Sequence, residues 1–300
     1  MKSRRLRHRA EALLARAALA LLRALGPARA SDLGGAVAGA VGPWLPVSRV
    51  AEINLRHALP ELNAGARRRV IRGVWDNLGR TVAELPHVAT LGPAAAGPGW
   101  VLEGSEVLRA CRDAGGPVIL FSGHIGCWEV LPRAAAVEGM PIGSFYRAAG
   151  NPEVDALIRA LRRQAVGADM PFFAKGSKGA RAAVLYLTRG GRLAMLVDQK
   201  MNEGIEARLF GRPAMTATAA AVFALRLRCP LLPVHAVRTG PARFRLVVEP
   251  PLPFPATGTP HADIAALTQA MNDCLERWVR AWPEGWLWLH RRFPQDVYRR

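Results

Sequence analysis

Cysteine is scarce in this chain, and its spacing excludes the usual cross-links. The four cysteines, Cys111, Cys127, Cys229 and Cys274, lie far apart and form neither a C-x-x-C pair nor a cysteine/histidine zinc spacing. We therefore expect no disulfide framework and no structural metal, and we expect the protein to work in a reducing compartment.

The sequence also lacks a long uncharged apolar run. A membrane-spanning helix needs roughly 20 such residues, and the nearest stretch, residues 10–25, is interrupted by Glu11, Arg16 and Arg23. An ordinary transmembrane anchor is therefore not expected. The apolar content of 50% over 300 residues is nevertheless ample for a sizeable core, in one large domain or two ordinary ones, and it excludes a disordered chain.

Acidic residues and lysine are the other shortages. The chain has 23 acidic against 41 basic residues, a net charge of +18, and its only lysines are Lys2, Lys175, Lys178 and Lys200. Arginine binds phosphates and carboxylates through paired hydrogen bonds, so nucleic acid, anionic lipid headgroups and an acidic carrier protein are candidate partners. Because no zinc-finger, RRM-like or heptad pattern places the arginines on a groove, we do not expect a nucleic-acid partner.

Residues 1–26 form a basic and apolar segment of strongly helical composition. A cationic cluster, Lys2, Arg4, Arg5, Arg7 and Arg9, precedes leucines set among alanines. Arg16 and Arg23 are seven residues apart and so lie on one helical face, which suits a helix in a headgroup layer with its cations directed outward. We expect a membrane-associating helix that lies at the interface; an amphipathic core helix and a cleaved secretory signal are the alternatives.

The rest of the chain divides at a Gly-, Ala- and Pro-rich linker, residues 91–99. Residues 27–95 are expected to form a helical N-terminal region. In residues 96–300, apolar runs typical of buried strands alternate with helical segments, which predicts an α/β domain with a largely parallel central sheet flanked by helices. We expect strands at 117–121, 142–146, 193–197, 231–237 and 244–248, and helices at 106–113, 128–137, 152–166, 178–188, 217–227 and 263–281.

The segment after the strand at 117–121 is the first place to look for chemistry, because ligands gather at the carboxyl ends of strands in an open α/β sheet. It reads Ser-Gly-His-Ile-Gly-Cys-Trp-Glu from 122 to 129. Two glycines around His124 permit a tight turn, and Glu129 falls in the first turn of the next helix. Across such a junction the two side chains can meet, and a carboxylate bonded to one imidazole nitrogen makes the other a general base.

Other interpretations of this segment stay open. The chain has no G-x-S-x-G elbow, so we infer that the nucleophile is a hydroxyl brought by the substrate, which attacks an acyl donor directly. Cys127 is either a competing nucleophile or, more plainly, a small buried residue. A histidine and a glutamate five residues apart can also be unrelated.

The segment 122–129 resembles the His-x4-acid block of the glycerolipid acyltransferase superfamily, and more closely that of the lipid A biosynthesis acyltransferases, the lauroyl/myristoyl transferases of Gram-negative bacteria. Further matches follow in order between about Asn54 and Phe293: Glu103-Gly104, Tyr146-Arg147 with Asn151-Pro152, Asp198-Gln199, the segment 210–213 with Thr216 and Thr218, and the segment 283–293. Cys127 stands where the family usually has asparagine, and Lys200-Met201 also depart from its pattern. These departures bear on the choice of acceptor or donor.

The resemblance implies transfer of a fatty acyl chain from an acyl carrier protein thioester to a hydroxyl of a lipid A precursor, at the cytoplasmic face of the cell inner membrane. It places His124 and Glu129 in the catalytic dyad, with His124 as general base and Glu129 holding the imidazole. No metal or cofactor is implied, since acyl-ACP or acyl-CoA is a substrate. The implied partners are the acyl carrier protein, the lipid acceptor and the anionic membrane surface, without nucleic acid.

Two alternatives to this function remain. The chain could acylate another lipid, such as a phosphatidylinositol mannoside or an aminolipid, with acyl-CoA as the alternative donor. It could also be a non-catalytic protein on the same fold that binds anionic lipid or nucleic acid.

Residues at other strand ends are candidates for substrate binding. Arg147 suits a phosphate clamp or an ordinary solvated charge. Asp198 and Gln199 could orient a hydroxyl, pair with Arg147 or stabilise a turn. Arg212 and Thr216, together with Thr218, could cradle a phosphate, and Thr216 could equally be a plain helix N-cap.

Two further expectations concern the reaction and the tail. The oxyanion formed from the thioester needs donors, which the amides of Gly126 and Cys127 or the guanidinium of Arg147 could supply. In the C-terminal segment, Trp282, Trp286 and Trp288 are expected in the core, with Arg291 and Arg292 outside, in preference to a membrane-interface role.

Overall fold

The computed structural model describes the backbone of residues 2–167 and 169–299, and the side chains of these residues from Arg5 onward. Met1, Ala168 and Arg300 lie outside the described residues. The side chains of Lys2 and Arg4, which belong to the basic cluster expected at the N-terminus, lie outside them too.

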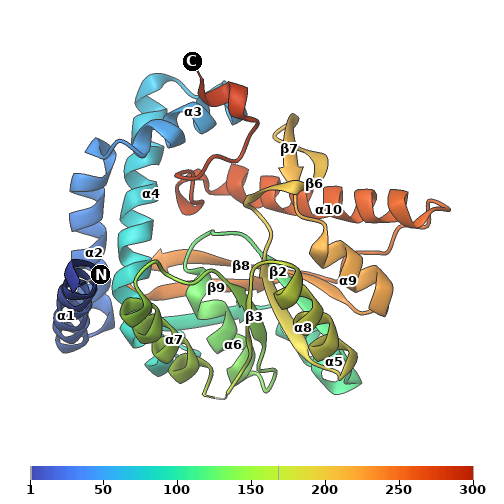
Figure 1. Cartoon of the computed structure of the whole chain (residues 1–300), viewed down its shortest axis with the longest axis horizontal. Helices are drawn as coiled ribbons and strands as arrows, with labels where there is room; N and C mark the ends of the chain where they lie inside the picture. Colours follow the sequence, from blue (N-terminus) through green and yellow to red (C-terminus); the bar gives the residue numbers. More distant parts are fainter. Residues whose placement is uncertain (1, 168, 300) are drawn as a thin grey trace.

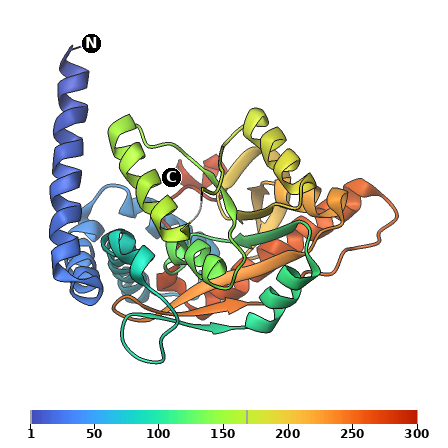
Figure 2. The ribbon, with the colours of Figure 1, turned by 90° about the horizontal axis from the view of Figure 1, so that it is seen from below.

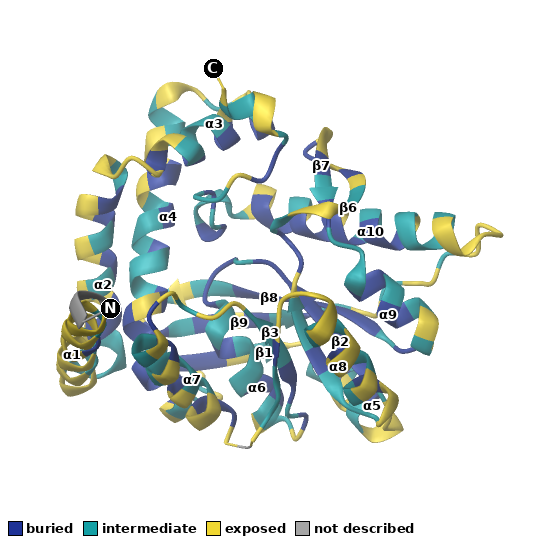
Figure 3. Ribbon diagram, in the orientation of Figure 1, coloured by how far each residue is buried: buried dark blue, intermediate teal, exposed yellow. Residues whose placement is uncertain are grey.

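The chain begins with helices α1 (Lys2–Leu25), α2 (Pro27–Val41), α3 (Ser48–Ala58) and α4 (Ala64–Glu84), together with the 3-10 helices η1 (Gly42–Trp44) and η2 (Leu85–Thr90). α2 packs closely along α4 where Gly34 faces Gly79. A Cβ on Gly79 would lie only 2.1 Å from the carbonyl oxygen of Gly34, so this close approach requires glycine. α1 runs along the outside of the molecule (Figure 2), and most of its surface is exposed (Figure 3). None of the described helices combines the length and the apolar character needed to cross a membrane.

Within the described ranges, seven strands form the central sheet in the order β1-β9-β8-β2-β5-β3-β4. Figure 1 shows β2, β3, β8 and β9 of this sheet with helices around them. They are β1 (Gly99–Glu103), β2 (Val118–Ser122), β3 (Gly143–Tyr146), β4 (Phe172–Ala174), β5 (Arg192–Leu196), β8 (Leu231–Gly240) and β9 (Arg243–Val248). The strands from β8 to β4 run parallel to one another. β9 is antiparallel to β8, and β1 is parallel to β9. The predicted α/β class with a largely parallel sheet is confirmed.

Helices flank both faces of this sheet, as the alternation of residues in β2 shows. Ile119 and Phe121 pack into a cluster with residues of α8 (Ser177–Thr188), α9 (Ala219–Leu227) and α10 (Pro260–Ala281). Val118 and Leu120 point the other way, toward a cluster with α5 (Ser105–Ala114) and α6 (Leu131–Val137). Because both faces of β2 are covered, its whole length is buried.

Local signals account for the ends of the helices that sequence alone placed well. In α7 (Pro152–Val166), the Asn151 side chain accepts a hydrogen bond from the Glu153 amide at 3.0 Å, Pro152 opens the first turn, and Gly167 ends the helix in the left-handed conformation. The expected helix at 128–137 is instead divided into η3 (Trp128–Val130) and α6. Pro132 stands in the first turn of α6, where proline is favoured.

Strands that carry little apolar pattern were not expected from the sequence. β1 is an edge strand whose last three residues are at least partly exposed, β4 has only three residues, and β6 (Lys200–Leu209) and β7 (Arg212–Thr216) form a separate antiparallel hairpin in which exposed, half-buried and buried positions are mixed. Such strands resemble loops in composition, because backbone hydrogen bonds to a neighbouring strand, and not buried apolar side chains, stabilise them.

A buried ionic network joins the N-terminal helices to the sheet. Glu84, at the end of α4, is fully buried and pairs with Arg238 of β8, with 2.9 Å between Arg238 Nη2 and Glu84 Oε2. The same carboxylate accepts hydrogen bonds from the Ser31 hydroxyl of α2 at 2.6 Å and from the Ala242 amide at 3.1 Å. Because the charges are paired and multiply hydrogen-bonded, the network can be buried between the two layers.

Candidate functional site

The turn after β2 carries the expected histidine and is fixed from several sides. The His124 carbonyl accepts from the Leu287 amide at 3.0 Å, and the Gly126 amide donates to the Gly285 carbonyl at 2.9 Å. Gly126 has a φ of +60°, and a Cβ at this position would lie 1.9 Å from the Ala236 carbonyl oxygen. The turn therefore requires glycine and is held against the C-terminal segment.

The carboxylate partner of His124 is Asp198, which follows β5. His124 Nδ1 lies 2.8 Å from Asp198 Oδ1, and the His124 backbone amide donates to Asp198 Oδ2 at 2.9 Å. The Trp286 indole also donates to Asp198 Oδ2, at 2.8 Å. An ionised carboxylate only accepts hydrogen bonds, so in the neutral imidazole Nδ1 carries the proton and Nε2 presents its lone pair.

Charge and burial at this pair define its electrostatics. Burial opposes a charged imidazole, but the neighbouring Asp198 carboxylate and, more weakly, Glu129 outweigh it and raise the pKa of His124. Burial alone would raise the pKa of Asp198, yet the charge of His124 and its hydrogen bonds hold that pKa well below its usual range. Asp198 is thus a permanent carboxylate that makes His124 more basic.

Glu129 does not hold the imidazole, which corrects the expectation from sequence. Its carboxylate is bound by Arg162 of α7, with Nε to Oε2 at 2.9 Å and Nη2 to Oε1 at 2.5 Å, and it also accepts from the Trp128 indole at 3.2 Å. Trp128 in turn lies edge-on to the His124 ring, with the ring centroids 5.1 Å apart. The charge of Glu129 helps to raise the pKa of His124, while Asp198 makes the direct hydrogen bond to the ring.

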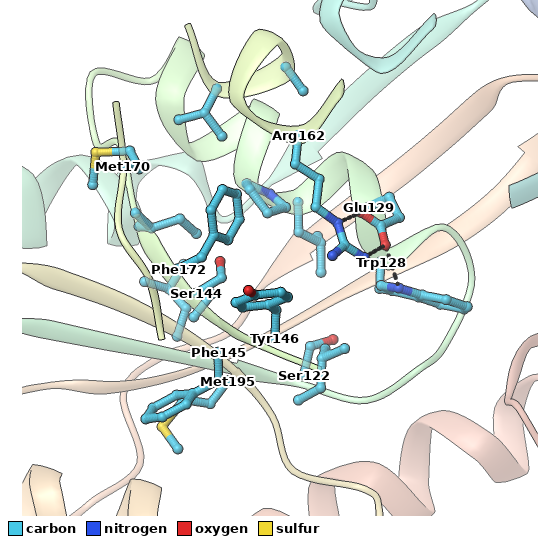
Figure 4. A pocket seen from close by; sticks show the side chains of 18 of the residues that line it. Ser122, Trp128, Glu129, Ser144, Phe145, Tyr146, Arg162, Met170, Phe172 and Met195 are labelled. Carbon is cyan, nitrogen blue, oxygen red and sulfur yellow. Dashed lines mark hydrogen bonds and ion pairs between the residues drawn. The ribbon is translucent and has the colours of Figure 1, made fainter. Parts of the chain in front are cut away.

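A cavity of about 300 Å³ opens beside His124. Much of its wall is apolar, with Leu120, Ile142, Val166, Met170 and Phe172 among the lining residues. In Figure 4, Glu129, Arg162 and Trp128 lie on one side of the cavity, Met170 and Phe172 lie on the other, and Tyr146 stands between them. The arrangement suits a ligand with a long apolar part and a reactive polar end.

Of the residues predicted for substrate binding, Arg147 and Gln199 line this cavity. Arg147 is exposed just beyond β3, and Gln199 accepts a hydrogen bond from Lys175 Nζ at 2.9 Å. Asp198 does not pair with Arg147, because its oxygens are taken by His124 and Trp286. Asp198 lies fully buried behind the histidine and positions it.

Arg212 and Thr216 do not line the cavity. Arg212 is exposed on β7, where its Nε donates to the His57 carbonyl at 3.3 Å. Thr216 is buried, and its hydroxyl accepts from Arg292 at 2.8 Å and from Asn272 at 3.1 Å. The N-cap of α9 is Thr218 and not Thr216, and its side chain makes no capping bond. The geometry therefore does not support a phosphate cradle here.

Cys127 is a buried residue and lies outside the cavity lining. Burial, followed by the nearby charge of Glu84, raises the pKa of its thiol well above the usual value. A thiol that stays protonated is a poor nucleophile, so the plainer of the two interpretations of Cys127 fits the structure.

Neither Gly126 nor Cys127, whose amides were expected to bind the oxyanion, lines the cavity. The amides of His124, Ile125 and Gly126 donate to Asp198, to the Gly123 carbonyl and to the Gly285 carbonyl. Gly126 is therefore not available to a substrate, which corrects its predicted role, and the buried Cys127 does not line the cavity.

The C-terminal segment is part of the core. Trp286 and Trp288 are buried and Trp282 is half-buried, as expected. Arg292, expected outside, is fully buried; it donates to the Met215 carbonyl at 2.9 Å and to Thr216, and burial lowers its pKa to about 10. This arginine ties the tail to β7, while Trp286 reaches Asp198.

Arg162, Lys175 and Trp286 contribute to the site, although no pattern in the sequence predicts a role for them there. Arg162 lies on an Arg-rich helix and Lys175 at the end of a very short strand, so neither is distinguished by spacing. Asp198 offered a usable signal, because it follows a strand adjacent to β2 and both strands end at the same edge. Among the described residues, no group of three or more His, Cys, Asp or Glu side chains could hold a metal ion.

Comparison with known proteins gives relatives that act on lipids. Two phosphatidylinositol mannoside acyltransferases, from two strains of Mycobacterium tuberculosis, are each 24% identical over 201 residues, which cover 66% of this chain and 61% of theirs. The crystal structure of the 1-acyl-sn-glycerophosphate acyltransferase PlsC from Thermotoga maritima aligns with a TM-score of 0.39 at 15% identity, over 79% of this chain and 97% of that one.

The model of one family spans nearly the whole chain, residues 1–295, and includes the turn of His124 and the segment that supplies Asp198 and Trp286. This chain belongs to the bacterial lipid A biosynthesis acyltransferase family.

Proposed function

We propose that this chain is an O-acyltransferase that moves a fatty acyl group from a thioester to a hydroxyl of a lipid. The observation that carries the proposal is the state of His124, whose Nδ1 is bound to Asp198 at 2.8 Å. Its Nε2 has no hydrogen-bond partner among the described residues, and the side chain lines an apolar cavity. Family membership supports the same chemistry.

The proposed reaction uses groups of this chain only to move a proton and to position substrates. His124 Nε2 takes the proton of the acceptor hydroxyl as its oxygen attacks the thioester carbonyl carbon. The tetrahedral intermediate then expels the thiolate, which receives the proton from the imidazolium. Asp198 stabilises the imidazolium, and the charge of Glu129, fixed by Arg162, adds to this effect.

The walls of the site support a proposal for the donor and the acceptor. The apolar cavity would hold the acyl chain, with acyl-ACP or acyl-CoA as donor and no cofactor. We propose a lipid A precursor as acceptor, with Arg147 at the cavity edge as the clamp for one of its phosphates. A phosphatidylinositol mannoside is the second candidate acceptor, because the relatives of that name match this chain over 201 residues.

The outer surface of the N-terminal helices supports membrane association. α1 exposes Leu6, Leu13, Leu14 and Leu21, and the neighbouring α2 and η1 expose Val37, Val41 and Trp44. Exposed arginines, including Arg9, Arg16 and Arg23, accompany them. We propose that this surface lies on the anionic cytoplasmic leaflet of the inner membrane, where apolar burial and charge act together.

Contacts also link the proposed membrane-binding surface to the active site. Asn151, four residues after Arg147, donates to the His8 carbonyl and to Glu11 of α1, each at 2.9 Å. A lipid headgroup at α1 would therefore lie next to the loop that borders the cavity. Acyl carrier protein, being acidic, would approach the same strongly basic molecule from the aqueous side. We propose no nucleic-acid partner.

The test is acyl transfer by the purified protein, followed by mass spectrometry. Acyl-ACP and acyl-CoA are offered as donors, each with a lipid A precursor and with a phosphatidylinositol mannoside as acceptors. We expect His124→Ala to abolish transfer while leaving vesicle binding unchanged, and His261→Ala, a change at an exposed histidine of α10, to be as active as the wild type. Absence of transfer with every pair, or a fully active His124→Ala variant, would contradict the proposal.

The acceptor can be identified in cells. Mass spectrometry of lipids from a strain that lacks the gene should show the loss of one secondary acyl chain from lipid A. An unchanged lipid A profile together with a lost acyl chain on another lipid would select the second candidate.

A further inference from the structure

Lys175 is a cation at the cavity that lies outside every sequence motif discussed above. It follows β4, lines the cavity together with His124, and is exposed. Its ammonium group donates to Gln199 Oε1 at 2.9 Å, and no ion pair found among the described residues involves it. An ammonium group has three donors, so two remain free to meet a ligand.

The Lys175–Gln199 bond fixes the ammonium group relative to the catalytic pair. Gln199 directly follows Asp198, whose carboxylate holds both the ring and the backbone amide of His124. Lys175 is thus connected to His124 through two consecutive residues of the β5 end. Its positive charge is felt at the imidazole, where it acts against Asp198 and lowers the pKa of His124.

The reaction needs such a group, because attack on a thioester pushes the carbonyl π electrons onto oxygen. That oxygen becomes negative as the new carbon–oxygen bond forms and stays so until the carbon–sulfur bond breaks. The amides of residues 124–126 are already bonded within the protein. Arg162 is also occupied, since it binds both oxygens of Glu129.

We propose that Lys175, held by Gln199, is the catalytic residue that stabilises the oxyanion of the thioester carbonyl beside His124. This assignment rests on the proposed acyl transfer. Arg147 also lines the cavity and has no side-chain hydrogen bond or ion pair within the described part of the chain, so it remains for the phosphate of the acceptor. The division of roles suits the two side chains, because a guanidinium matches a phosphate through paired bonds and an ammonium group acts as a compact point charge.

The test compares Lys175→Met and Lys175→Arg with the wild type, and uses Lys178→Met as a matched control. Lys178 is an exposed lysine of α8 that does not line the cavity. For Lys175→Met we expect kcat to fall about 10²-fold, with KM for donor and acceptor within about threefold, since only transition-state stabilisation is lost. Lys175→Arg should recover part of kcat, and Lys178→Met should match the wild type.

The pH profile separates this role from a merely structural one. With the Lys175 charge removed, the pKa of His124 rises, and the acid limb of kcat/KM should move to higher pH. An unchanged kcat, with or without a raised KM, overturns the assignment, and so does a lost kcat with an unmoved acid limb. If Arg147→Met, and not Lys175→Met, lowers kcat at constant KM, the oxyanion donor is Arg147 and the assignment is wrong.

The same data distinguish this inference from the proposed function. Transfer that His124→Ala abolishes and Lys175→Met leaves unchanged refutes the role of Lys175 alone. Absence of transfer by the wild type refutes both. Because Lys175 is exposed, its variants should unfold at the wild-type temperature, which a thermal melt verifies.

Discussion

Asp198→Asn tests the central pair of the site with the smallest possible change of shape. Two donors, the His124 amide and the Trp286 indole, point at Oδ2, at 2.9 and 2.8 Å. The oxygen of an asparagine must occupy that side, because an amide NH2 there would face two N–H groups. The NH2 is then directed at His124 Nδ1, which has to accept instead of donate.

This geometry sets the size of the effect. An imidazole that accepts at Nδ1 carries its proton on Nε2 and cannot act as the base. The equivalent change in a Ser-His-Asp triad lowers kcat by about 10⁴, which corresponds to about 5 kcal/mol of activation free energy. We expect a loss of that order in Asp198→Asn, whereas Glu129→Gln should lose only about tenfold, because Glu129 acts through charge alone.

The pH profile shows in which direction the pKa of His124 changes. Asp198 raises the pKa of His124 in the wild type, and the base must be neutral to act, so activity rises with pH through that pKa. In Asp198→Asn the acid limb of the residual activity should move to lower pH.

The assay is steady-state acyl transfer between pH 5 and 9, with Asp273→Asn, a change at an exposed position of α10, as the control. A thermal melt of each variant shows whether it is folded under the assay conditions. Asp198→Asn activity near that of the wild type, a larger loss in Glu129→Gln, or an acid limb that stays in place would refute the role given to Asp198.

Substitutions in the turn, the first helix and the cavity wall test other parts of the structure. Gly126→Ala should destabilise the fold by about 2–4 kcal/mol in denaturant melts, because its Cβ would lie 1.9 Å from the Ala236 carbonyl oxygen at a φ of +60°; a melt like that of the wild type would contradict this. Cys127→Ala should keep kcat within about threefold of the wild type, since the thiol is buried and protonated. A large loss of kcat in a folded variant would restore Cys127 as a nucleophile. Leu13→Glu with Leu14→Glu should weaken binding to anionic vesicles at least 100-fold in a sedimentation assay, because each leucine contributes about 1.5–3 kcal/mol when buried. Retained binding would place the membrane contact elsewhere. Ile142→Trp should shift the transferred chains to shorter lengths, as read by mass spectrometry, because Ile142 lines the cavity; unchanged lengths would place the chain outside it.

Much of the fold follows from local patterns in the sequence. The apolar run ending at Phe121 predicts a strand covered on both faces, and the Asn-Pro start and glycine end of the helix at 152–166 fix its boundaries. Both signals can be read from the sequence, because a strand buried on both faces is a continuous apolar run and a helix cap depends on residues adjacent in the chain. Strands such as β4 and the β6–β7 hairpin lack them and were missed.

The position of His124 is the part of the site that the sequence determines by itself. A buried strand that ends in a glycine-flanked histidine places an imidazole at the carboxyl edge of the sheet, whatever the rest of the chain does. The strongly basic, leucine-bearing first helix of the chain is also determined by the sequence, through its composition alone.

The partners of that histidine were decided by tertiary structure. Glu129 is five residues from His124 and yet binds Arg162, while Asp198, which is 74 positions away, reaches the ring because β5 pairs with β2 in register. Arg292 is buried for a similar reason, since β7 offers it a carbonyl and a hydroxyl. Which charges meet depends on strand order and helix packing, and these arise from contacts between segments that are distant in the chain.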